Sequence, residues 1–158
     1  MTSPPEYPGV DRAYDFVLPS YNWALDRLKA VDSRLQEIMA YAATLTFASP
    51  IVAGAVLKKP EYNSPCFYGS LALFVVVIAI GLYFRARGNL HLVTPAALYD
   101  LWLYKDEPTF KKDAVYFAGK HMAMNQRLIN RKGHAADMMT VLLGAELLLL
   151  LDWIIRQV

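Results

Sequence analysis

This chain of 158 residues lacks the short motifs on which most enzymes and metal sites depend. Its single cysteine, Cys66, excludes an intrachain disulfide and a zinc site built from several thiolates, so we interpret it as a small apolar residue. The phosphate-binding P-loop, the dinucleotide glycine fingerprint, the H-E-x-x-H motif and the serine elbow of hydrolases are absent. The three histidines have no carboxylate or cysteine partner at a spacing typical of metal ligands. We therefore expect no enzyme, no metal site and no cofactor.

Charged side chains are absent or rare in three long stretches of the sequence. Residues 38–57 and 66–84 contain no charged side chain, and residues 138–155 contain only Glu146 and Asp152. A helix of about 20 apolar residues crosses a bilayer of about 30 Å. A composition that is 56% hydrophobic leaves too much apolar surface for so small a soluble domain. The sequence therefore predicts an all-α fold with three transmembrane helices.

Basic residues are distributed unevenly around these three stretches. Lys and Arg number 4 before the first stretch, 2 in residues 58–65, 9 in residues 85–137 and 1 after the third stretch. The positive-inside rule then places the N-terminus and residues 85–137 in the cytoplasm of a bacterial inner membrane, with the C-terminus outside. The first 37 residues are polar and mixed in charge, so we expect no cleaved signal peptide, and the first span directs insertion.

The N-terminal half is expected to form a tail, a long helix and a transmembrane hairpin. Four prolines predict an irregular tail over residues 1–19, and Ser20 is suited to cap a juxtamembrane helix that continues into the first span, so residues 20–84 form one unit. Apolar side chains recur in this helix at heptad spacing, as a seam that we expect to be used for oligomerisation: Ala24, Leu28, Val31 and Leu35. The seam has two compatible uses, packing on residues 85–137 of the same chain or packing between copies.

Residues 85–137 are expected to form a helical cytoplasmic insertion between the second and third spans. Gly88 followed by Asn89 predicts a break, a short helix is expected over residues 95–104, and a second one from about Thr109 to Arg131. Gly133 predicts another break before the third span, which occupies residues 138–158, and the alternative is that the helix continues through it. A segment of this length is too short for an independent catalytic domain.

Glu146 is the most informative residue, because it lies near the middle of the third apolar stretch. An acid at the bilayer centre costs about 2.5–3.5 kcal/mol on insertion scales, so such residues face a partner, a cavity or a water path. Several copies in a symmetric ring could line a pore, with Thr140 and Gly144 on a small polar face of the same helix. The alternative is a neutral carboxyl that hydrogen-bonds to a neighbouring helix and holds the two helices together.

Pro50 predicts a kink in the first span, and this kink is either static or a hinge.

A set of basic and amide side chains precedes the third span. Lys120, Arg127 and Arg131 fall near one helical face, at steps of 7 and 4 residues, and His121, Asn125 and Lys132 lie alongside. Cations with amides and ring faces can bind a phosphodiester and contact its bases. The alternative is that these residues meet the anionic lipid of the inner leaflet.

The overall layout resembles the small multi-span transmembrane effectors of bacterial anti-phage systems that use nucleotide second messengers, including cyclic-nucleotide-gated and Hailong-type effectors. The resemblance rests on the helix that feeds the first span (Ala24 to Leu57), on the tight hairpin, and on the stretch from Thr109 to Trp153. Its most family-like part is the run Asn125, Leu128, Arg131 and Lys132. The resemblance implies an oligomeric pore that permeabilises the infected cell and is controlled by a nucleotide from a partner nucleotidyltransferase. The Hailong case implies a short oligodeoxyadenylate that keeps a tetrameric channel shut.

We therefore expect a symmetric homo-oligomer, a tetramer, that acts as a nucleotide-controlled toxic pore in anti-phage defence. The competing interpretation is a scaffold or accessory subunit of a larger membrane complex that conducts nothing. Ion conduction is the property that separates these two classes.

Overall fold

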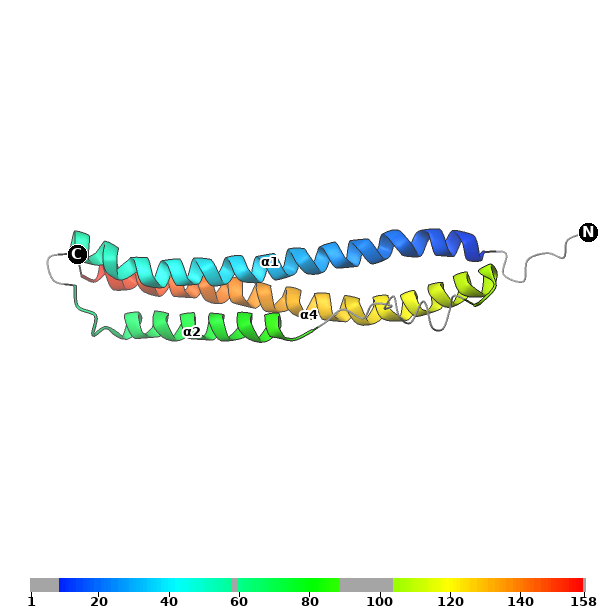
Figure 1. Cartoon of the computed structure of the whole chain (residues 1–158). Helices are drawn as coiled ribbons and strands as arrows, with labels where there is room; N and C mark the ends of the chain where they lie inside the picture. The colour runs from blue at the N-terminus through cyan, green and yellow to red at the C-terminus, as the bar shows by residue number, and fades with distance from the viewer. Residues whose placement is uncertain (1–8, 58–59, 89–103, 158) are drawn as a thin grey trace, which may run out of the picture. The chain divides into compact units, whose positions relative to one another are not determined.

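The chain forms three long helices in the computed structural model, which describes residues 9–57, 60–88 and 104–157. They are α1 (Val10–Val56), α2 (Pro65–Ala86) and α4 (Glu107–Ile155) (Figure 1). Each helix is long and apolar enough to cross a membrane, which confirms the all-α fold and the three membrane-length helices. The chain divides into two compact units, Met1–Lys29 with Asn89–Asn130, and Ala30–Gly88 with Arg131–Val158.

Helix α1 begins at Val10, ten residues before the predicted start, so an irregular tail up to residue 19 is wrong for residues 10–19. Ser20 is not a cap, because its hydroxyl donates to the Phe16 carbonyl at 2.9 Å inside the helix. A proline inside a helix costs about 3 kcal/mol, but it removes only one hydrogen bond. The turns before Pro19 pack on α4, where the rings of Tyr14 and Phe110 lie 6.3 Å apart. Such tertiary contacts offset the local cost of the proline.

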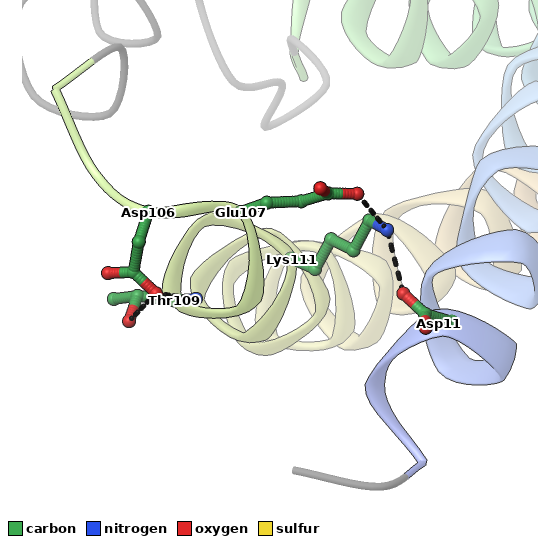
Figure 2. Close-up of polar contacts among 5 residues, drawn as sticks. All are labelled: Asp11, Asp106, Glu107, Thr109 and Lys111. Carbon is green, nitrogen blue, oxygen red and sulfur yellow. Dashed lines mark hydrogen bonds and ion pairs between the residues drawn. The ribbon is translucent and has the colours of Figure 1, made fainter. Parts of the chain in front are cut away.

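Helix α4 begins at Glu107, two residues before the predicted start, and Figure 2 shows the contacts at this end. The Asp106 carboxylate accepts hydrogen bonds from the Thr109 hydroxyl and backbone N–H, at 3.1 and 3.3 Å, and these bonds lower the pKa of Asp106. Lys111 donates to Asp11 of α1 at 2.7 Å and to Glu107 at 2.6 Å, and these acceptors raise the pKa of Lys111. Within the first unit, the ammonium group of Lys111 therefore links α4 to α1.

Breaks predicted at two glycines have opposite outcomes. Helix α2 ends at Ala86, and Gly88 has a φ of 105°, which favours glycine, so this break is confirmed. Helix α4 instead continues through Gly133, so a break there is wrong. Glycine in a helix costs only about 1 kcal/mol relative to alanine, and the buried Ala135 and Ala136 of the next turn hold the helix in place. The short helix expected over residues 95–104 falls almost entirely outside the described residues.

The second unit packs the three helices around an apolar core. In this unit α1 and α4 run in the same direction with α2 antiparallel beside them (Figure 1). Two polar pairs between α1 and α4, Asp32–Lys132 and Thr46–Glu146, share an offset of 100 residues. One buried cluster takes members from all three helices: Leu35, Ile38, Ala42, Val77, Ala136 and Met139.

Gly81 provides a test of how closely α2 approaches this core. A Cβ at Gly81 would lie 2.7 Å from Met39 Cγ and 3.0 Å from Met139 Cε, which is closer than side chains pack. We expect Gly81→Leu to lower the free energy of unfolding by about 1–3 kcal/mol through overpacking. The matched control is Gly144→Ala, because nothing lies within 4 Å of a Cβ there. Circular dichroism of the detergent-solubilised protein would measure both, and equal stability of the two variants would contradict close packing at Gly81.

Candidate functional site

Glu146 is fully buried within one chain, with an exposed fraction of 0%. Its Oε1 accepts a hydrogen bond of 2.5 Å from the hydroxyl of Thr46 on α1, and Thr46 is itself buried. Its Oε2 is also buried and has no hydrogen-bond partner among the described residues. The carboxyl group therefore joins α1 to α4 through one oxygen, and the other oxygen is left without a donor.

Apolar packing encloses this pair on both sides along the helices. Toward the start of α1 and α4 lies the cluster that contains Ala42, Val77 and Met139. Toward their ends lies a second cluster of Ala53, Leu150 and Trp153. Glu146 thus sits between two apolar layers of its own chain.

Pro50 gives Thr46, the hydrogen-bond partner of Glu146, a second unusual feature. Helix α1 continues past Pro50 to Val56, and Pro50 is four residues after Thr46. Proline has no backbone N–H, so the Thr46 carbonyl receives no helical hydrogen bond from position 50. Thr46 therefore brings two polar groups to this region, a hydroxyl bonded to Glu146 and a carbonyl without its helical donor.

Thr140 and Gly144, expected to line a pore with Glu146, lie in a different place. Both line a surface groove of about 370 Å³ between α1 and α4, which a set of mostly apolar side chains completes: Tyr41, Thr44, Leu45, Leu143 and Leu147. The Thr140 hydroxyl donates to the Ala136 carbonyl of its own helix at 2.8 Å. Glu146 is not among the lining residues, so the structure does not bring the three pore residues together in one chain.

Lys132, expected to contact a ligand, is occupied within the chain. Its side chain is 2% exposed, and its ammonium donates to Asp32 of α1 at 2.8 Å. A second ion pair between the same helices, Arg34 with Asp137 at 3.0 Å, is largely exposed. Lys132 therefore acts in packing α4 on α1 and does not belong to an exposed basic surface.

The other residues of the expected ligand set divide into engaged and exposed groups. The Tyr21 hydroxyl and His121 Nδ1 share a hydrogen bond of 3.2 Å, and Asn125 is 2% exposed. Lys120 and Arg127 are exposed on α4 in the first unit, and Arg131 is exposed in the second. The exposed part of the ligand set therefore consists of these three cations.

The seam residues of α1 are directed mainly at the chain itself. Ala24 and Leu35 are buried, and Leu28 and Val31 are half-buried. Leu35 packs with Val77, Ala136 and Met139 in the core cluster of the second unit. Packing within the chain was one of the two expected uses of the seam, and its use between copies stays a prediction.

The C-terminal end of α4 makes polar and aromatic contacts with the start of α2 and with the connection between α1 and α2. Asp152 accepts a hydrogen bond from Arg156 at 2.8 Å, and the Cys66 thiol donates to the same carboxylate at 3.0 Å, so Cys66 is more than a small apolar residue. Trp153 Nε1 donates to the Glu61 carbonyl at 2.9 Å. This end of the second unit is held by side-chain contacts to the connection between α1 and α2.

Within residues 9–57, 60–88 and 104–157, no group of three or more His, Cys, Asp or Glu side chains is placed to hold a metal ion.

Comparison with protein-family models, with curated proteins and with solved structures finds no match to this chain. The resemblance to nucleotide-signalled anti-phage effectors therefore stays a prediction.

Proposed function

We propose that this chain is an inner-membrane protein of three spans that assembles into a symmetric homo-oligomer, a tetramer, and acts as a nucleotide-controlled pore in anti-phage defence. The three membrane-length helices and the distribution of Lys and Arg support insertion with the N-terminus and residues 85–137 in the cytoplasm and the C-terminus outside. In this arrangement residues 20–37 form a juxtamembrane helix, and residues 107–137 of α4 lie on the cytoplasmic side.

The observation that carries the proposal is the fully buried carboxyl of Glu146 near the middle of residues 138–155, the apolar stretch of α4. Ionisable side chains inside membranes are costly and mark ion paths, proton relays or ligand sites. Because apolar clusters lie on both sides of Glu146, we assign the described conformation to a closed state. Opening then requires α1 and α4 to separate, so that Glu146 leaves Thr46 and faces water.

Control by a nucleotide rests on the exposed cations of α4. Lys120 and Arg127 can pair with the phosphates of a nucleotide or short oligonucleotide made by a partner nucleotidyltransferase, whereas Arg131 belongs to the second unit. Lys132 leaves the proposed ligand set because Asp32 already holds it. Anionic lipid is the competing occupant of the same cations.

The alternative function, a non-conducting scaffold or accessory subunit, is favoured by the surface groove. Small residues permit close helix approach in membranes, and Thr140 and Gly144 line this groove at a spacing of four residues. A helix of another membrane protein packed there would need no water path. Ion flux through the purified protein in liposomes distinguishes the two functions.

Topology can be tested with reporter fusions at Asn89 and Val158. The three-span arrangement predicts a cytoplasmic reporter at the first position and an external one at the second, because one span separates them. Paired reporters, one active only in the cytoplasm and one only outside, would measure both positions. Reporters on the same side at both positions would remove the three-span model.

Nucleotide binding can be tested with Lys120→Ala and Arg127→Ala. We expect each variant to weaken binding of a short oligodeoxyadenylate several-fold, and to reduce the salt dependence of the affinity, because each loses a phosphate contact. Lys29→Ala is the matched control, since Lys29 is an exposed cation of α1 in the same unit. Unchanged affinity in both α4 variants would assign these cations to lipid.

A further inference from the structure

The surroundings of Glu146 contain more hydrogen-bond acceptors than donors. The Thr46 hydroxyl gives its hydrogen to Oε1, and Oε2 finds no donor among the described residues. The Thr46 carbonyl receives no helical N–H, because position 50 is a proline. One buried acceptor, Oε2, therefore lacks a hydrogen, and the Thr46 carbonyl lacks its helical donor, whereas buried polar groups are nearly always satisfied in native proteins.

A single proton on the carboxyl would give the unpartnered Oε2 a hydrogen to donate. We propose that Glu146 and Thr46 form a proton-binding site, in which a proton on Oε2 makes the carboxyl a donor to the Thr46 carbonyl while the Thr46 hydroxyl donates to Oε1. Pro50 removes a donor from that carbonyl, and the carboxylic acid supplies one in its place. This inference rests on the proposed insertion of the three spans in a bilayer and does not require conduction.

The charges along the three helices favour a proton over ionised Glu146. Residues 38–57, 66–84 and 138–155 contain no Lys, Arg or His that could pair with a carboxylate. The titratable groups nearest along each helix are Tyr41 on α1, Tyr68 and Tyr83 on α2, and Asp137 and Asp152 on α4, and the ones on α1 and α4 lie at least five positions from Thr46 and Glu146. An unpaired charge in an apolar interior is strongly disfavoured.

The oxygen count also favours a proton over a metal ion. The site offers the two oxygens of Glu146 and the hydroxyl and carbonyl oxygens of Thr46, with apolar clusters on either side. Calcium takes six to eight oxygen ligands and magnesium six. A proton needs only one donor position and one acceptor, which this pair provides.

The site also suggests how proton release relates to helix separation. Loss of the proton would leave a charged carboxyl with a single donor, Thr46, in an apolar surrounding. Moving Glu146 away from α1 toward water would relieve that cost. A bound proton therefore favours contact between α1 and α4, and its release favours their separation.

Infrared spectroscopy of the full-length protein in lipid bilayers tests the inference. At neutral pH we expect the carbonyl stretching band of one carboxylic acid per chain, lost in Glu146→Gln and retained in Asp152→Asn. The band should move to higher frequency in Thr46→Val and in Pro50→Ala, because each weakens a hydrogen bond of the acid. Pro19→Ala, at the other proline within α1, should leave the band unchanged.

Three results would overturn the inference. One is the absence of any acid band that depends on Glu146, which would mean an ionised group. Another is an unchanged frequency in Pro50→Ala, which would remove the Thr46 carbonyl as the acceptor. The third is a band that disappears on adding sodium at fixed pH, which would mean a cation site. An alkaline carbonate wash of the same liposomes tests insertion separately, so failure of the membrane proposal is distinguishable from failure of the proton site.

Discussion

Lys132→Met is expected to lower the free energy of unfolding by about 2–3 kcal/mol. Removing one partner of a buried ion pair costs about 3–5 kcal/mol, because the other charge remains without compensation. Lys132 is 2% exposed, but Asp32 is 32% exposed and keeps some hydration, which reduces the cost. Unfolding by sodium dodecyl sulfate in mixed micelles, followed by circular dichroism, would measure the change.

The neighbouring pair of Arg34 with Asp137 provides the matched control for this prediction. It joins the same two helices at 3.0 Å, but its side chains are 50% and 64% exposed. Exposed pairs contribute about 0–1 kcal/mol, so Arg34→Met should have little effect. The double variant Asp32→Leu with Lys132→Met should recover most of the stability, because no unpaired charge remains. Equal losses in the two single variants would contradict burial of the Lys132 pair.

Glu146→Leu is expected to abolish ion leakage and toxicity while the chain keeps its fold. Leucine can extend the apolar clusters on either side, and the Thr46 hydroxyl can turn to the carbonyl of Ala42 in its own helix. A pore with an apolar constriction dewets and does not conduct. Fluorescent ion flux into proteoliposomes, with circular dichroism of the same samples, would measure both properties.

Asp152→Asn is the control for the Glu146 prediction, since it removes the other acid of the third span. Asp152 lies at the end of α4 beside Arg156, and its loss should leave ion flux intact. If Glu146 only holds helices together, Glu146→Leu should instead lower stability and leave conduction per assembled oligomer unchanged. That outcome would favour the scaffold or another pore lining.

The sequence predicted the helical fold because its strongest signals are local and physical. The uncharged runs 38–57 and 66–84 correspond to parts of α1 and α2, and the heptad spacing of Ala24 and Leu35 identified two residues that the structure buries. These signals depend on solvation and helical periodicity, which the chain carries in its composition. Helix ends were predicted less well, since Pro19 and Gly133 have modest local costs that packing overcomes.

The partners of the polar residues could not be predicted from local pattern. Glu146 was recognised as unusual, but its partner Thr46 is 100 positions away, and the sequence contains no sign of the register between α1 and α4. The same reason explains why Lys132 was grouped with exposed cations, although it is buried and pairs with Asp32. The separation of Glu146 from Thr140 and Gly144 is by contrast a local property, because their angular positions on one helix already direct them to different surfaces.

Reversal potentials of the purified protein in planar bilayers under a potassium chloride gradient test the central claim most directly. The proposal of an oligomeric pore controlled by Glu146 predicts a cation-selective current from the wild-type protein. It also predicts that in Glu146→Gln, which keeps size and hydrogen bonding but removes the charge that faces water in the open state, the reversal potential moves toward zero. No current from inserted wild-type oligomers, or the same reversal potential in both proteins, would contradict it.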